Sequence, residues 1–326
     1  MAHNLAVING ETAMAYAGET PWHGLGKRLP KMANVQDALV AANLDWQVEA
    51  VPMFLASGEE VQGRRAMLRD DGTQLGTVGA GYVPRQNADA FGILDASCRD
   101  HGVRIEAAGA LGKGERTWML ASMDATLEIE TPGGIDRVNG YFLVANGHDG
   151  RCAHYGKITP IRVVCQNTLS AAGNAAEDNL VHIYHTKRSD EMLVQARKLV
   201  HTLTASLVET GETFGALARA EMTPNQIEAY IASVFPAGDD SKVSERLGKC
   251  REDIATLVRT GRGSELAGET AWGAYNAVVE YLDHVKPAEA KSKAGQVRAA
   301  TSAVFGTGDQ IKALALKLAT RVAVAA

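Results

Sequence analysis

The feature that most constrains the fold is a change of hydrophobic period near residue 186. Before that point, short β-branched runs are punctuated by glycine and aspartate, whereas long alanine- and leucine-rich segments follow it. A period of two is typical of strands, and a period of about 3.6 is typical of helices. The sequence therefore predicts an α+β region followed by an all-α helical bundle.

Turn signals divide the first region into paired strands. An Asp-Asp-Gly turn at residues 70–72 separates two strand-like runs, because Asp-Gly readily adopts the positive φ of a tight turn. Two further pairs of strand-like runs are each joined by a glycine-containing turn, at residues 112–114 and at residues 147–150. Asn34 is expected to cap a short helix. The region is therefore predicted to be antiparallel and rich in β-hairpins, with helices.

Capping residues predict helix limits in the second region. Thr223, Pro224 and Gln226 supply an N-cap, a proline at the first helical position and a capping-box glutamine. Asp309 is expected to cap the last helix. Helices with one apolar seam bury it against one another or against another copy of the chain, so we expect a homo-oligomer. The predicted domains are an N-terminal arm (1–30), an α+β domain (31–186) and a helical bundle domain (187–326).

Composition excludes several classes of protein. The chain has 33 Lys and Arg against 38 Asp and Glu, a formal net charge of −5, which argues against a histone-like coat but permits a local basic surface. No run approaches the ~18 apolar residues of a membrane span, and the N-terminus lacks the pattern of a secretory signal. Four cysteines without a CxxC pair are typical of reduced thiols. We expect a cytoplasmic protein that does not bind membranes.

Common catalytic motifs do not occur in the sequence: GxxxxGK[ST], GxSxG and HExxH are all missing. Enzymatic chemistry stays open through one group of residues, which would suit a metal-dependent hydrolase or nuclease. The group consists of His148, Asp149, His154 and Cys165. A separate possibility is a Cys165 thiolate activated as a nucleophile by His148 or His154. A buried structural cysteine explains Cys165 better, so no catalytic residue is predicted.

Two further histidines, His182 and His185, are three positions apart in a strand-like run. Residues three apart on a strand face opposite sides, so this pair would chelate a metal together only in a helix or a turn. Ordinary hydrogen-bonded histidines fit the spacing better than a zinc site does. The sequence therefore predicts no metal ligand here and no cofactor.

A second candidate chemistry is nucleic-acid binding. From residue 141 to residue 162, cations and aromatic rings are interleaved with a single acid, Asp149. Cations neutralise phosphates while bases stack on rings, which suits single-stranded nucleic acid. The candidate binding residues are Lys113, Arg116, Trp118, Arg151, Tyr155, Lys157, Arg162, Lys187 and Arg188. The alternative is that the rings belong to the core and the cations solvate its rim.

Four strings together resemble one protein family. They are TPWHGLG, NGHDGRCAHYGKITPIRVVCQNTLSAA, HTKRSDEMLVQARKLV and TAWGAYNAVVEYLDH, in that order along nearly the whole chain. They are similar to the phage/plasmid-like protein family, a domain of unknown function found in phages, prophages and plasmids. The resemblance implies a context of DNA replication, recombination or counter-defence and assigns no catalytic residue. In element order, the α+β region is also similar to phage single-strand annealing proteins.

These observations predict a mobile-element accessory protein that binds single-stranded DNA or RNA without covalent chemistry, in recombination or annealing. Two alternatives come from other classes. One is the metal-dependent hydrolase or nuclease described above. The other is a protein-interaction module, such as a host-defence antagonist, that acts through its helical half.

Overall fold

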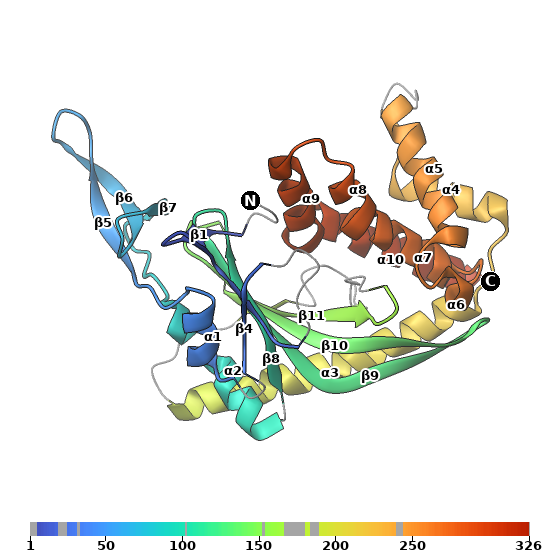
Figure 1. The fold of residues 1–326 in the computed structure, drawn as a ribbon, viewed down its shortest axis with the longest axis horizontal. Helices are drawn as coiled ribbons and strands as arrows, with labels where there is room; N and C mark the ends of the chain where they lie inside the picture. The colour runs from blue at the N-terminus through green and yellow to red at the C-terminus, as the bar shows by residue number, and fades with distance from the viewer. Residues whose placement is uncertain are drawn as a thin grey trace.

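The computed structural model describes residues 5–18, 25–30, 33–101, 103–151, 154–165, 180–182, 189–238 and 244–325. Within these ranges the protein is α+β, with the sheets in the N-terminal part and most of the helices in the C-terminal part (Figure 1). No helix in the described ranges is long and apolar enough to cross a membrane.

The central sheet has seven strands in the order β12-β11-β10-β9-β8-β3-β4. Neighbouring strands pair antiparallel except β3 and β4, which are parallel. The strands are β3 (Met14–Tyr16), β4 (Lys27–Arg28), β8 (Arg104–Leu111), β9 (Arg116–Thr131), β10 (Gly134–Gly147), β11 (Tyr155–Arg162) and β12 (Leu180–His182). The hairpins predicted around residues 112–114 and 147–150 are confirmed, since β8 pairs with β9 and β10 with β11.

The strands β9 and β10 form one long hairpin, whereas the sequence predicted two shorter strands in separate pairs. Residues Gly134 and Thr131 face each other at its tip. On one side of this segment, Glu128 and Glu130 are exposed. Ile129 on the other side is buried among the C-terminal helices. The hairpin therefore extends beyond the sheet into the helical part.

The first thirty residues, expected to form an arm, contribute strands to the central sheet. Ala15 of β3 pairs with Ala108 of β8, and both side chains are fully buried. A short hairpin, β1 (Val7–Ile8) and β2 (Glu11–Thr12), precedes β3. The pairing joins segments about ninety positions apart, and local periodicity contains no signal for such a contact.

A separate three-stranded sheet projects from the body of the protein (Figure 1). It consists of β5 (Val48–Phe54), β6 (Glu60–Arg69) and β7 (Gln74–Gly79). The predicted turn at residues 70–72 joins β6 to β7, and Gly72 has a φ of +82°. The sequence predicted a tight turn here because an Asp-Gly pair readily adopts such a positive φ.

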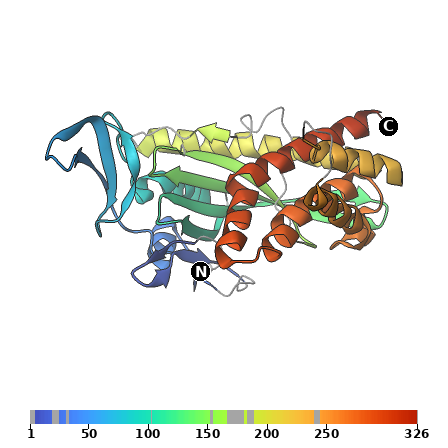
Figure 2. The same ribbon diagram turned by 90° about the horizontal axis from the view of Figure 1, so that it is seen from above.

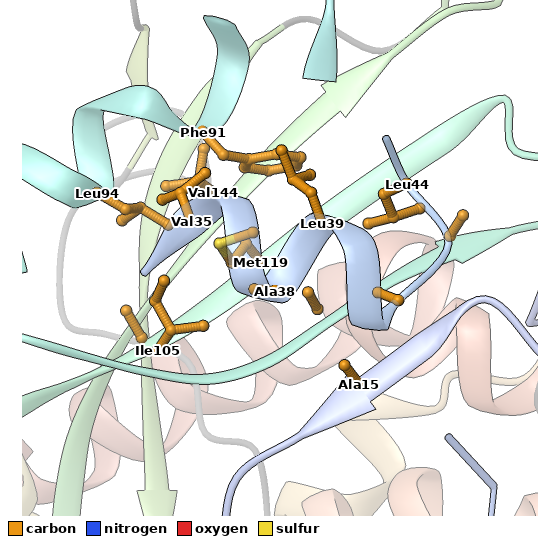
Figure 3. Packing of buried hydrophobic residues seen from close by; sticks show 14 of the residues in the cluster. Ala15, Val35, Ala38, Leu39, Leu44, Phe91, Leu94, Ile105, Met119 and Val144 are labelled. Carbon is orange, nitrogen blue, oxygen red and sulfur yellow. The ribbon is translucent and has the colours of Figure 1, made fainter. Parts of the chain in front are cut away.

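Three helices pack on one face of the central sheet: α1 (Val35–Ala41), α2 (Asn87–His101) and α3 (Ser189–Arg219). Asn34 caps α1 as predicted, and its side chain accepts a hydrogen bond from the Asp37 backbone at 2.8 Å. Figure 3 shows Leu39 of α1 and Phe91 of α2 packed near Met119 of β9. Burying each large apolar side chain stabilises the fold by roughly 1.5–3 kcal/mol.

The C-terminal part consists of α4 (Pro224–Val234), α5 (Glu245–Thr260), α6 (Ser264–Ala267), α7 (Ala271–Glu280), the π-helical turn η2 (Tyr281–Val285), α8 (Lys286–Ala288), α9 (Lys293–Phe305) and α10 (Thr307–Ala325). The capping box that starts α4 is confirmed, with Thr223 as N-cap and Gln226 as its partner. The prediction for Asp309 was wrong. Because α10 begins at Thr307, Asp309 lies in its first turn.

The helices do not form an all-α bundle that is closed on itself. Ile129 and Val138, from the tip of the β9–β10 hairpin, belong to their core. Leu207 of α3 packs in the core of the sheet, whereas Phe214 of the same helix packs in the core of the helices. Figure 2 shows α3 running along the molecule between the two parts. The predicted boundary near residue 187 stays a prediction.

Candidate nucleic-acid interface

The register of the strands assigns each side chain to one of two faces of the central sheet. Successive residues of a strand point to opposite sides. Met119, Phe142 and Ile158 lie on the face that α1, α2 and α3 cover. Trp118 and Tyr155 have the opposite parity and lie on the other side. We call that side the reverse face; its central residues are Arg116, Trp118, Leu120, Leu143, Ala145, Tyr155 and Lys157.

Two aromatic rings share a row on the reverse face. Trp118 of β9 and Tyr155 of β11 both pair with Ala145 of β10, and Gly109 is the other neighbour of Trp118. Two strand spacings put the pair about 10 Å apart, with only a methyl group between them. The indole Nε1 of Trp118 is buried and has no hydrogen-bond partner among the described residues. Half-buried rings over small residues are suited to stacking with bases.

Cations lie in the rows on either side of these rings. Arg116 pairs with Gly147, two positions from the row of the rings, and is half-buried. No described carboxylate forms an ion pair with it. Lys157 pairs with Leu143 in the row on the opposite side. Its Nζ donates to Asp309 Oδ2 at 2.9 Å and to the Val304 carbonyl at 3.1 Å. The reverse face thus combines two rings with two flanking cations.

The reverse face also carries residues that sequence reasoning missed. The row of Lys157 continues through β8 to Tyr16 of β3 and ends at the exposed Arg28 of β4. A further row contains Arg104, which is exposed, and Tyr141, which is half-buried. Burial raises the pKa of the Tyr141 hydroxyl. No local signal placed these residues beside the others. Their rows depend on strand pairings between distant segments, which only the folded structure specifies.

Arg162 does not belong to this interface, although it was expected to contact phosphate. It lies on the covered face and is only 1% exposed. Its guanidinium donates to Asp136 Oδ2 through Nε at 2.7 Å and through Nη2 at 2.6 Å. The Trp272 indole donates to the same oxygen at 2.9 Å, and the Gly263 carbonyl accepts from Arg162 at 2.8 Å. A guanidinium enclosed in this way has no surface left for a phosphate.

The remaining candidates lie at the end of the sheet or beyond the described residues. Lys113, in the β8–β9 turn, and Arg151, after β10, are both exposed. Both turns adjoin the strand end that carries Arg116. Lys187 and Arg188 lie outside the described residues. Of the nine predicted positions, the fold therefore gathers Arg116, Trp118, Tyr155 and Lys157 on one face.

The group proposed for hydrolysis is not assembled. Cys165 lies beyond the end of β11 that pairs with Val138, whereas His148 lies beyond the other end, where Ala145 pairs with Tyr155. Seven strand positions separate these ends, about 23 Å. His154 contacts Arg85 instead, and Cys165 accepts a hydrogen bond from Arg162. In the described ranges, no group of three or more His, Cys, Asp or Glu side chains is placed to hold a metal ion.

His148 has the surroundings of a structural residue. Its ring is fully buried, 5.2 Å from the Trp46 ring in an edge-on arrangement, with Nε2 3.0 Å from Asn87 Oδ1. Thr117 donates its hydroxyl hydrogen to the same amide oxygen. Burial lowers the pKa of His148 to about 4, so the ring is neutral at pH 7. A buried, neutral imidazole held by Asn87 has no route to a substrate. His182 is part of β12, and His185 lies outside the described residues.

Comparisons with known proteins give one finding. A family model described as "Domain of unknown function (DUF932)" matches residues 74–304, which include β8 to β11 of the reverse face and the helices from α2 into α9. No curated protein and no solved structure matches the chain.

Proposed function

The chain belongs to the DUF932 family, a domain of unknown function, and we propose that it binds single-stranded nucleic acid on the reverse face of its sheet. Arg116 and Lys157 neutralise phosphates, while Trp118 and Tyr155 provide surfaces on which bases stack. One observation carries the proposal. The two rings share a row across Ala145, and the cations flank that row on either side.

The binding path extends from this centre in two directions. At one end, the exposed Lys113 and Arg151 lie in the turns next to Arg116. Toward the far edge of the sheet, Arg28 and Arg104 add positive charge. Cations spread along a surface in this way compensate locally for the acidic total, because screening limits interactions between exposed charges to about 8–10 Å in physiological salt.

A single strand is favoured over a duplex because the rings need access to base faces. Bases in a duplex are stacked on one another, whereas those of a single strand are free to stack on protein rings. Stacking recognises the π-face that every base has, so we expect little sequence preference. A cytoplasmic role in phage or plasmid recombination and self-association into a homo-oligomer remain parts of the proposal. They are supported by the sequence resemblance and the apolar helix seams rather than by the geometry of the face.

The test is a salt series of fluorescence anisotropy with labelled single-stranded DNA, single-stranded RNA and duplex DNA. We expect the single strands to bind more tightly than the duplex. On a single strand, log K falls linearly with log salt, by ~0.7 for each neutralised phosphate. An affinity for single strands that does not change with salt would contradict the proposal.

A pair of double variants assigns the binding to the reverse face. Arg116→Gln with Lys157→Gln should weaken binding and flatten the log–log slope by about 0.7–1.4, which corresponds to one or two phosphate contacts. The matched control is Arg259→Gln with Lys249→Gln, which removes an exposed arginine and an exposed lysine from α5. Equal losses in the two double variants would show that general charge, and not this surface, governs binding.

A further inference from the structure

Lys157 already has an anionic partner within the chain. Its Nζ donates to Asp309 Oδ2 at 2.9 Å, and the side chains of Lys157 and Asp309 are 14% and 38% exposed. Its second acceptor is the Val304 carbonyl at 3.1 Å. The cation of the reverse face that lies beside Tyr155 is therefore held by the C-terminal helices.

The acceptors come from a tight junction between two helices. Val304 lies at the C-terminal end of α9, where the helix dipole is negative, and Asp309 lies in the first turn of α10. A Cβ on Gly308 would lie 2.8 Å from the Ala303 Cα, so the two helices approach each other closely. The Gly308 backbone also donates to the Ser302 hydroxyl at 3.0 Å. These contacts hold the Asp309 carboxylate beside the sheet.

A carboxylate and a phosphate diester present the same chemistry to a lysine, namely a negative charge on oxygen acceptors. We propose that Asp309 occupies the position of a nucleic-acid phosphate on the reverse face and competes with nucleic acid for Lys157. The contact is thus autoinhibitory, and this inference rests on the proposed function. A partly exposed ion pair is weak, typically worth no more than ~1 kcal/mol in isolation, so a strand that gains several contacts can displace the carboxylate.

The competition has two measurable consequences. Removing the Asp309 charge frees Lys157, so affinity for a single strand rises by roughly threefold to fivefold, the size expected for one partly exposed ion pair. The salt dependence also steepens by about 0.7 in the log–log slope. In the wild type, a phosphate at Lys157 replaces an existing anion, whereas in the variant it neutralises an unpaired cation and one more counterion is released.

The experiment compares the dissociation constants of four proteins for the same single-stranded DNA across a salt series. They are the wild type, Asp309→Asn, Asp309→Asn with Lys157→Gln, and Asp253→Asn. Asp253 pairs with Lys249 on α5 and is 30% exposed, so its variant makes the same charge change away from the sheet. Asp309→Ser is a second neutral variant with a smaller side chain, and circular dichroism checks that α10 persists in both variants.

We expect tighter, more salt-dependent binding in both Asp309 variants, no such gain in Asp253→Asn, and no gain when Lys157 is also replaced. If the wild type binds with the expected salt dependence and the Asp309 variants bind no tighter, the inference is wrong and the proposed function stands. A gain that persists without Lys157 also overturns the inference. If no protein binds single strands at any salt concentration, both the inference and the proposed function fail.

Discussion

The two faces of the central sheet place similar residues in different surroundings. On β11, Lys157 and Arg162 are five positions apart, so one lies on the reverse face and the other under the helices. Arg162 is enclosed with a fully buried Asp136, whereas Lys157 pairs with a partly exposed Asp309. The parity of a strand position therefore decides whether a cation supports the fold or remains within reach of a ligand.

The two faces also differ in how much an ion pair contributes to the stability of the fold. Removing one partner of a buried ion pair leaves an uncompensated charge in the protein interior and costs about 3–5 kcal/mol. An exposed or partly exposed pair contributes about 0–1 kcal/mol. Substitutions on the covered face should therefore act on folding, and those on the reverse face on binding. Four predictions test this division, beginning with the largest expected effect.

Arg162→Met should lower the free energy of unfolding by about 3–5 kcal/mol, because it leaves the Asp136 carboxylate buried without its cation. Urea denaturation measures the change. Arg116→Gln, which removes an arginine from the reverse face, should change the stability by no more than about 0.5 kcal/mol. Equal losses for the two variants would erase the distinction between the faces.

Stability should fall at acidic pH because of His148 on the covered face. Its folded-state pKa of about 4 lies below the ordinary value of 6.5, so the unfolded chain binds the proton first. The contribution of this group is constant above pH 6.5 and falls by about 3 kcal/mol as the pH drops to 4. Denaturation at several pH values across this range should show that the free energy of unfolding depends less on pH in His148→Gln than in the wild type. An identical pH dependence of the free energy of unfolding for the wild type and His148→Gln would contradict the assignment.

Trp118→Leu should weaken binding of single-stranded DNA by about 1–3 kcal/mol, the contribution of stacking per base. Trp118→Phe keeps an aromatic face and should retain most of the affinity. Anisotropy titrations at constant salt give both values. Because Trp118 also packs against the buried cluster of Leu5, Met14 and Leu111, thermal melting of each variant should accompany the titration. If the Leu and Phe variants bind equally, the ring does not act by stacking.

The smallest effect is expected at the edge strand β4, where two neighbouring cations have opposite parity. Arg28→Gln should flatten the log–log salt slope by about 0.7, as expected for one lost phosphate contact. Lys27 aligns with Ala15 on the covered side and pairs with Glu11 at 2.6 Å, so Lys27→Gln should leave the slope unchanged. The same slope in both variants would show that parity does not decide access at this edge.

Local features of the fold were readable from the sequence. The N-cap at Asn34, the capping box at Thr223 and the turn at residues 70–72 were predicted correctly, because each depends on residues within four positions of one another. The candidate interface was readable in part. Trp118 and Tyr155 were selected by residue type, but their common row depends on how two hairpins share β10.

What escaped prediction depends on contacts between distant segments. Arg162 was misassigned because its partners, Asp136 and Trp272, come from another strand and from a helix more than one hundred residues later. Arg28 was missed because β3 and β4 join the sheet next to β8, which follows them by some eighty residues. Residue type and spacing alone do not show on which face of the sheet a side chain lies, nor which helix covers that face.

The placement of α3 has a consequence for dissecting this protein. Leu207 and Phe214 are two turns apart on one helix, yet each completes a different core. A fragment that ended before this helix would expose the apolar underside of the sheet, and a fragment that began with it would lack the hairpin tip carrying Ile129. Neither half is expected to fold stably when it is expressed alone, so genetic and biochemical work on this protein is best done on the intact polypeptide.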